Sequence, residues 1–315
     1  MSRVDRRRFV QQALCLSAGL SVVASLSQAA APRGAAAVSL TTTPLGAGLW
    51  CIAGGGGNVV VLDSPAGVLL VDGGSPEHSG QVLKQVRALT GKARVHTLFN
   101  THWHWDQTGS NPALGSAGTR IIAHENTRLW LSTDVDSKWE GRQYKRLSPK
   151  AWPNQSFYTT GMLEFGGERI EYGYLGQAHT DGDIFVHLRN ADVLVVGDVL
   201  AVGRYPVIDY CTGGWIGGMV TAAQTLLARC NAGTKLVPGM GAVQNRDDLE
   251  AQHAMLGDLK QKLSRLLAQG MSVQDMIDAR PTADYDAKWG DPRLFIANVW
   301  PGLVQRAREL GVSIV

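Results

Sequence analysis

The sequence lacks the features that mark several common protein classes. Its 315 residues include only four cysteines, none in a Cys-x-x-Cys pair, and they contain no internal repeat. The 30 Lys and Arg residues outnumber the 27 Asp and Glu residues only because four arginines and one aspartate lie within residues 1–31. The remainder has no net charge, so its composition does not predict a nucleic-acid partner.

Two common catalytic motifs are also missing. The run Gly54–Gly57 is followed by neither Lys-Ser/Thr nor a helical pattern, so it predicts a flexible hairpin loop rather than a phosphate-binding loop. There is no serine nucleophile elbow. Beyond residue 31 the cysteines number three, which are Cys51, Cys211 and Cys230. This odd number favours buried thiols over a disulfide framework.

Residues 1–31 have the pattern of an export signal. Arg6, Arg7 and Arg8 precede an apolar stretch over 13–24, and small residues end the segment at 29–31. This order is typical of a cleaved signal peptide, and the paired arginines resemble the twin-arginine type. We therefore expect a periplasmic or secreted bacterial protein without a stable membrane span once the signal is removed. The alternative is a membrane-anchoring helix, but no other stretch is long enough to span a bilayer.

The rest of the chain is predicted to form one domain. Residues 32–44 are rich in Ala, Pro, Gly and Thr and are expected to be a linker. From residue 45 to residue 315, strands come first, then strands and helices alternate, and no Pro- or Ser-rich segment divides them. This order predicts an α+β fold in which sheets pack together with helices outside.

Two later regions of this domain have distinct patterns. Residues 133–160 are polar and have no clear period, so they predict a long surface loop or lid. The tryptophans Trp139, Trp152 and Trp215 fall in loops, where they either pack or line an apolar pocket. From about residue 247 onward we expect C-terminal helices, including one whose start is marked by the capping pair Ser272 and Asp275.

The densest polar cluster follows an apolar strand over 95–99. It contains His102, His104 and Asp106, which lie on one face if the backbone stays extended, because strand side chains alternate. The intervening Trp103 and Trp105 then point to the opposite face and pack. Two imidazoles and a carboxylate are suitable ligands for a borderline metal ion such as zinc.

Two later motifs supply further candidate ligands. His179 lies in a loop between predicted strands, and Asp198 ends the strand over 192–197. Both stand at strand termini, so they can converge on the first cluster. Three histidine ligands with an open position are a recurrent hydrolytic zinc site, in which the metal makes hydroxide available and polarises a carbonyl.

These motifs, with Asp72-Gly73-Gly74 upstream, resemble the metallo-β-lactamase superfamily in order and context from about residue 45 to about residue 245. The likeness is greatest to exported members with a helical tail and includes the stretch 205–209. It implies a four-layer αβ/βα sandwich of the metallo-β-lactamase type with a metal site at one edge. The metal ligands that it implies are His102, His104, Asp106, His179 and Asp198. Asp106 is also expected to act in catalysis, by orienting the attacking hydroxide or accepting its proton.

Two departures from the family pattern concern the second metal. The pattern His-x-His-x-Asp-His ends here in Gln107, and the turn Pro-Gly-His-Gly reads Pro238-Gly239-Met240-Gly241. A carboxamide oxygen is a weak zinc ligand, and a thioether prefers softer ions. We therefore expect one tightly bound zinc, with the second site empty or weak.

The sequence thus predicts an exported zinc-dependent hydrolase that acts on a small-molecule substrate. In this interpretation metal-bound hydroxide attacks an ester, lactone, thioester or β-lactam carbonyl. The alternative is a non-catalytic or metal-binding relative that kept the fold after losing second-site ligands. The loss of those ligands argues against two-metal redox chemistry. No motif specifies the scissile bond or the oligomeric state.

Overall fold

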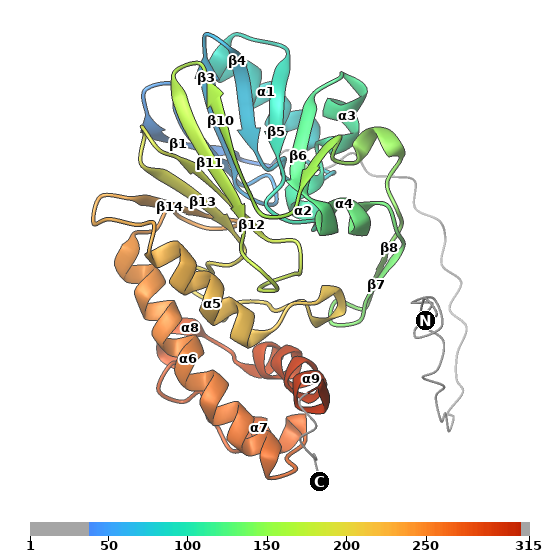
Figure 1. Ribbon diagram of the computed structural model, residues 1–315, viewed down its shortest axis with the longest axis vertical. Helices are drawn as coiled ribbons and strands as arrows, with labels where there is room; N and C mark the ends of the chain where they lie inside the picture. Colours follow the sequence, from blue (N-terminus) through green and yellow to red (C-terminus); the bar gives the residue numbers. More distant parts are fainter. Residues whose placement is uncertain (1–37, 310–315) are drawn as a thin grey trace, which may run out of the picture. The chain divides into compact units, whose positions relative to one another are not determined.

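The computed structural model of the protein describes residues 38–309, and Figure 1 shows two sheets with helices on their outer faces. The predicted signal peptide over 1–31 and residues 32–37 of the predicted linker lie outside the described residues. Within the described range, no helix combines the length and the apolar character needed to cross a lipid bilayer.

The first sheet has seven strands, all from the first half of the chain. They are β1 (Thr41–Gly46), β2 (Leu49–Ala53), β3 (Val59–Ser64), β4 (Gly67–Val71), β5 (Val95–Phe99), β6 (Arg120–His124) and β9 (Gln155–Phe157). They lie side by side in that order. The pairs from β1 to β4 are antiparallel, whereas β4, β5, β6 and β9 are parallel.

The second sheet has five strands in chain order. They are β10 (Thr160–Phe165), β11 (Glu168–Tyr174), β12 (Ile184–Leu188), β13 (Val193–Gly197) and β14 (Lys235–Pro238). Only the β13–β14 pair is parallel. A separate hairpin consists of β7 (Val135–Ser137) and β8 (Arg142–Tyr144), which pair only with each other.

The helices fall into two groups along the chain. The first half contains α1 (Ser79–Thr90), α2 (Trp105–Thr108), α3 (Asn111–Ser116), α4 (Glu125–Leu131) and the 3₁₀ turn η2 (Pro149–Ala151). The second half contains the 3₁₀ turn η3 (Tyr210–Thr212), α5 (Ile216–Leu227), α6 (Arg246–Ala268), α7 (Val273–Asp278), α8 (Asp286–Trp289) and α9 (Arg293–Glu309). The predicted capping box is confirmed, because Ser272 and Asp275 bond each other's backbone at the start of α7.

Strand side chains alternate between two apolar cores, and this alternation defines the layers. In β13, Val193 and Val195 face the other sheet, whereas Leu194 and Val196 pack against helices. On the first sheet, α1 and α3 cover the outer face, and α5 and α6 cover that of the second (Figure 1). The predicted four-layer αβ/βα sandwich is confirmed.

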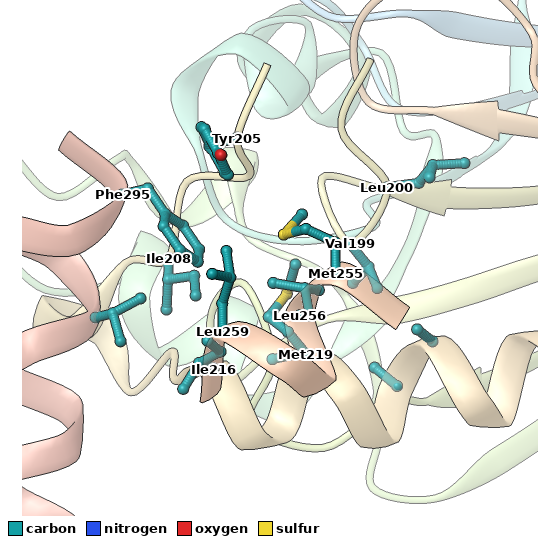
Figure 2. Close-up of a cluster of buried hydrophobic side chains, with 14 of the residues drawn as sticks. Val199, Leu200, Tyr205, Ile208, Ile216, Met219, Met255, Leu256, Leu259 and Phe295 are labelled. Atoms are coloured by element: carbon teal, nitrogen blue, oxygen red, sulfur yellow. The ribbon is translucent and has the colours of Figure 1, made fainter. Parts of the chain in front are cut away.

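The C-terminal helices extend the outer core of the second sheet. Figure 2 shows a cluster of buried side chains from this core, which includes Val199 and Leu200 just after β13, Met219 of α5, Leu256 of α6 and Phe295 of α9. All five side chains are at most 2% exposed. Burial of each such side chain contributes about 1.5–3 kcal/mol of transfer free energy. The helical tail is therefore part of the same folded unit as the sheets.

Two local predictions were wrong. Part of the segment 32–44, expected to be a linker, belongs to β1, whose Leu45 is buried between the sheets. The segment 133–160, expected to be a long loop, contains β7, β8, η2 and β9. These pieces are only three residues long, too short to give a readable period.

Candidate metal centre

Polar side chains gather at one edge of the sandwich, where strands of both sheets end. His102 and His104 follow β5 of the first sheet, Asp198 follows β13 of the second, and His179 lies in the loop before β12. The structure thus brings together residues up to 96 positions apart, from His102 to Asp198. The predicted convergence of these four residues is confirmed.

Three imidazoles and one carboxylate point at the same small volume. One ligand atom from each of the four residues lies within 4.8 Å of the others. His104 Nδ1 is 3.2 Å from His102 Nε2 and 2.9 Å from His179 Nε2. Asp198 Oδ2 lies 3.9 Å from His102 Nε2 and 3.7 Å from His179 Nε2. The imidazoles are buried, and the Asp198 side chain keeps 15% exposure. The cluster therefore opens to solvent beside Asp198.

Hydrogen bonds on the far side of two rings set which nitrogen faces the cluster. His104 Nε2 lies 3.1 Å from Asp209 Oδ2, and His179 Nδ1 lies 2.8 Å from the carbonyl oxygen of Val207. Both oxygens accept, so both nitrogens donate, and in the neutral rings His104 Nδ1 and His179 Nε2 keep free lone pairs. Metal-ligating histidines commonly have such outer partners.

His102 is supported through a two-step chain. Thr101 Oγ1 donates to Asp72 Oδ2 at 2.8 Å and accepts from His102 Nδ1 at 3.1 Å. Asp72 also accepts from the Thr101 backbone N–H at 2.8 Å. These bonds leave His102 Nε2 with a free lone pair that faces the other two imidazoles. The predicted Asp72-Gly73-Gly74 motif thus reaches the cluster through Thr101.

Burial controls the charge of the cluster. Burial and the neighbouring imidazoles of His104 and His179 lower the pKa of His102 well below its usual value, so this ring is neutral at pH 7. Burial and the nearby Asp198 raise the pKa of Asp106 to about 6. Lone pairs of imidazoles that face one another beside carboxylates repel unless a cation lies between them. Nitrogen and oxygen donors in this combination fit zinc.

Asp106 is the predicted ligand that lies outside the four-residue group. Residues 105–108 form α2 with His104 as its N-cap, so Asp106 lies on a helical turn. The prediction that His102, His104 and Asp106 share an extended face was therefore wrong. The Asp106 carboxyl is still near enough to Asp198 and His104 for their charges to affect its pKa. Its role as ligand or proton acceptor stays a prediction.

Gln107 and Met240 lie in different surroundings. Gln107 is fully buried, and its Nε2 donates to the carbonyl oxygen of Gly239 at 3.3 Å. Met240 is 37% exposed and lines a small cavity together with Asp198 and Arg204. A Cβ at position 239 would overlap Asp198 Oδ1, so this turn needs glycine. The turn therefore lies directly against the cluster.

Asp209 is a functional residue that sequence reasoning missed. It is fully buried and orients His104. Its one signal was its place at the end of the stretch 205–209, to which no role was attached. The tryptophans that flank His104 also differ from each other, because Trp103 is buried as predicted and Trp105 is only half-buried.

The three cysteines within residues 38–309 take no part in the cluster. Cys51, Cys211 and Cys230 are free thiols. Burial raises the pKa of Cys51 and of Cys230 to about 11, so both are protonated at neutral pH and are poor metal ligands. The prediction of buried thiols without a disulfide is confirmed for Cys51, and the other two are half-buried.

Comparison with known proteins identifies the family. Residues 52–255 match the family model described as the Metallo-beta-lactamase superfamily, which covers more than half of the chain. The protein therefore belongs to this superfamily, as its motifs predicted. Members are mostly metal-dependent hydrolases, and the His102, His104, His179 and Asp198 cluster fits that chemistry.

Two relatives show the range of the sequence similarity. The chain is 26% identical over 183 residues to the 2,4-dinitroanisole O-demethylase subunit alpha of Nocardioides sp. (strain JS1661), a match that covers 56% of this chain and 52% of that protein. It is 25% identical over 189 residues to the metallo-beta-lactamase type 2 of Bacillus sp. (strain 170), covering 60% and 68%. The chain thus spans about half the length of the demethylase subunit.

Solved structures share the fold. The metallo-beta-lactamase from Pontibacter korlensis superposes with a TM-score of 0.58 at 19% identity, covering 70% of this chain and 100% of that chain. For the DIM-1 metallo-beta-lactamase the TM-score is 0.56 at 17% identity, covering 70% and 99%. At this level of identity, the likeness establishes the sandwich architecture.

Proposed function

We propose that the protein is an exported, zinc-dependent hydrolase that cleaves an ester, lactone, thioester or β-lactam bond in a small molecule. The observation that carries the proposal is the convergence of three imidazole lone pairs and one carboxylate at the edge of a metallo-β-lactamase sandwich. Zinc held there would make hydroxide available at neutral pH and polarise the substrate carbonyl.

Side chains of the protein would bind the ion, and hydrogen bonds behind them fix their orientation. His102, His104 and His179 would hold the ion through their facing nitrogens, with Asp198 as the fourth ligand. The outer hydrogen bonds of the three rings restrict them to one orientation, which lowers the entropic cost of assembling the site. We expect one tightly bound ion, because Gln107 and Met240 are poor replacements for imidazole.

Asp106 is proposed to orient the attacking water or to accept its proton. Asp106 lies on the first turn of α2, two positions after the proposed ligand His104. Asp106 lies near enough to Asp198 and His104 for their charges to affect its pKa. A carboxylate at hydrogen-bonding reach of the attacking water can serve as a general base.

Substrate is proposed to approach the cluster from the partly exposed side of Asp198, beside the small cavity that Arg204 and Met240 also line. Asp198 is the one member of the four-residue cluster that is not classed as buried. The named relatives are a β-lactamase and an O-demethylase subunit, which act on different bonds, so a panel of bond types is the appropriate test. The export proposal rests on the signal pattern over 1–31.

The experiment combines metal analysis with a substrate panel. Zinc-loaded protein is expected to retain close to one zinc per chain and to turn over at least one of a chromogenic ester, a lactone, a thioester and a β-lactam. The variant His179→Ala should lose most of the metal and the turnover, whereas His253→Ala, on α6, should keep both. Zinc without turnover of any panel member would favour a metal-binding relative. Failure to bind zinc would refute the proposal.

A further inference from the structure

The buried carboxylate of Asp209 connects the metal cluster to a distant hairpin. Its Oδ2 accepts from His104 Nε2 at 3.1 Å and from Thr212 Oγ1 at 2.6 Å. Its Oδ1 accepts from Trp139 Nε1 at 3.0 Å and from the Cys211 backbone N–H at 3.0 Å. Cys211 and Thr212 are close to Asp209 in the chain, whereas Trp139 is 70 positions away from it.

Trp139 lies in the turn of the β7–β8 hairpin. The two strands pair only with each other, so the hairpin has no sheet to hold it. At its base, Val135 and Tyr144 pack against Trp103. In its turn, the Trp139 ring centroid lies 6.3 Å from that of His104. The other turn residues are exposed, and they are Lys138, Glu140 and Gly141.

The two oxygens of a carboxylate form one rigid plane. A donor that fixes Oδ1 therefore also fixes the direction in which Oδ2 faces. At Asp209 this means that the indole N–H of Trp139 helps to set the position of the oxygen that holds His104. His104 in turn presents Nδ1 to the Nε2 atoms of His102 and His179.

From this geometry we propose that Trp139 is a positioning residue of the metal centre, which acts through Asp209 to hold His104 in its metal-binding orientation. The inference rests on the proposed metal site and deepens it. It has two consequences. Loss of the indole N–H lowers metal affinity, and because such coupling is reciprocal, metal binding makes the hairpin turn more rigid.

The test compares two substitutions of the same chemistry. Trp139→Phe removes the N–H and keeps an aromatic ring. Trp152→Phe does the same to another half-buried indole, whose N–H donates to the carbonyl oxygen of Leu147 at 3.0 Å instead of to Asp209. The zinc dissociation constant is measured by competition with a chromophoric chelator. We expect it to rise about 10-fold for Trp139→Phe and less than about 2-fold for Trp152→Phe.

A double-mutant cycle separates positioning from a general loss of stability. The variant Asp209→Ala removes both carboxylate oxygens and therefore breaks the link between Trp139 and His104. Adding Trp139→Phe should then raise the dissociation constant less than about 2-fold further. Equal effects of Trp139→Phe in both backgrounds would mean that it acts through overall stability, which would overturn the inference.

Hydrogen exchange gives a readout that is independent of affinity. Zinc should slow amide exchange over residues 138–141 in the unsubstituted protein and in Trp152→Phe, but not in Trp139→Phe. If the unsubstituted protein binds no zinc, both the proposed function and this inference fail. If it binds zinc and Trp139→Phe binds zinc equally well, only this inference fails.

Discussion

Single hydrogen bonds decide which ring nitrogen each histidine presents to the metal cluster. His102 and His179 present Nε2, whereas His104 presents Nδ1. The difference follows from the local backbone, because His104 is the N-cap of α2 and its Nε2 reaches the buried Asp209. Removal of an outer acceptor therefore changes the orientation of a ring as well as its basicity.

The departures at positions 107 and 240 give a test at this scale. The double variant Gln107→His and Met240→His should take up a second zinc, because Asp106 and Asp198 are already present to complete a shell with two imidazoles. Zinc per chain, measured by elemental analysis, should rise from about one to about two. Gln107→His alone serves as the control and should bind less of the second ion.

Position 240 lies near Asp198, and position 107 is connected to it through Gly239. Met240 lines the same small cavity as Asp198, whereas Gln107 bonds Gly239, and Gly239 packs against Asp198. If the double variant takes up no second metal, residues 107 and 240 do not face a common site. The assumed correspondence of the turn 238–241 with that of the family would then be wrong.

At the scale of single elements, the sequence was informative wherever a pattern repeated. The continuous apolar run in β13 and the helical spacing in α1 and α6 gave the right elements. The short helix α2 was missed, because four residues are too few to show a period of 3.6. Asp106 was therefore predicted to lie on an extended segment, and the predicted direction of its side chain was wrong.

The start of α6 is a capping box that can be tested alone. Asn245 accepts from the Asp248 backbone N–H, and the Asp248 side chain accepts in return from the Asn245 N–H. Asn245→Ala should lower the free energy of unfolding by about 1 kcal/mol, since it leaves backbone donors of the first turn unpaired. Chemical denaturation measures the change.

Asp247→Ala is the matched control for this substitution. Asp247 is an exposed acidic residue of the same first turn and is not part of the capping box. Its loss should cost only the interaction with the helix dipole, about 0.3–1 kcal/mol. Unfolding free energies that fall more for Asp247→Ala than for Asn245→Ala would contradict the capping explanation.

At the scale of the whole molecule, the four proposed metal ligands come from the two different sheets. His102 and His104 belong to the first sheet's side, and His179 and Asp198 to the second. An ion bound to the folded state alone stabilises it by about 2.7 kcal/mol at a concentration 100 times its dissociation constant. Chelation should therefore lower the melting temperature by several degrees, at roughly 2–4 °C per kcal/mol.

Calorimetry with and without EDTA measures this shift. His179→Ala should melt at the same temperature with and without zinc, because it lacks one of the three imidazoles. A melting temperature that chelation leaves unchanged in the unsubstituted protein would mean that the ion adds nothing to the joining of the sheets.

The sequence predicted four members of the cluster, because each lies in a short contiguous motif. The same motifs carried the resemblance from which the family and the layers were predicted. It did not reveal the pairing of Asp209 with Trp139 or with His104. Those partners are 70 and 105 positions away, and a lone Asp or Trp in a loop has no periodic neighbours to mark its direction. Such contacts depend on how loops meet after the sheets have packed.

Each sheet is drawn from one uninterrupted stretch of chain, the first from Thr41–Phe157 and the second from Thr160–Pro238. During synthesis the first sheet is complete before any strand of the second leaves the ribosome. A first sheet that formed at that stage would carry His102 and His104, and the apolar face that it shares with the second sheet would still be uncovered. His179 and Asp198 are synthesised only with the second stretch. Tight binding of an ion by all four residues would therefore indicate that the two stretches of chain have packed together.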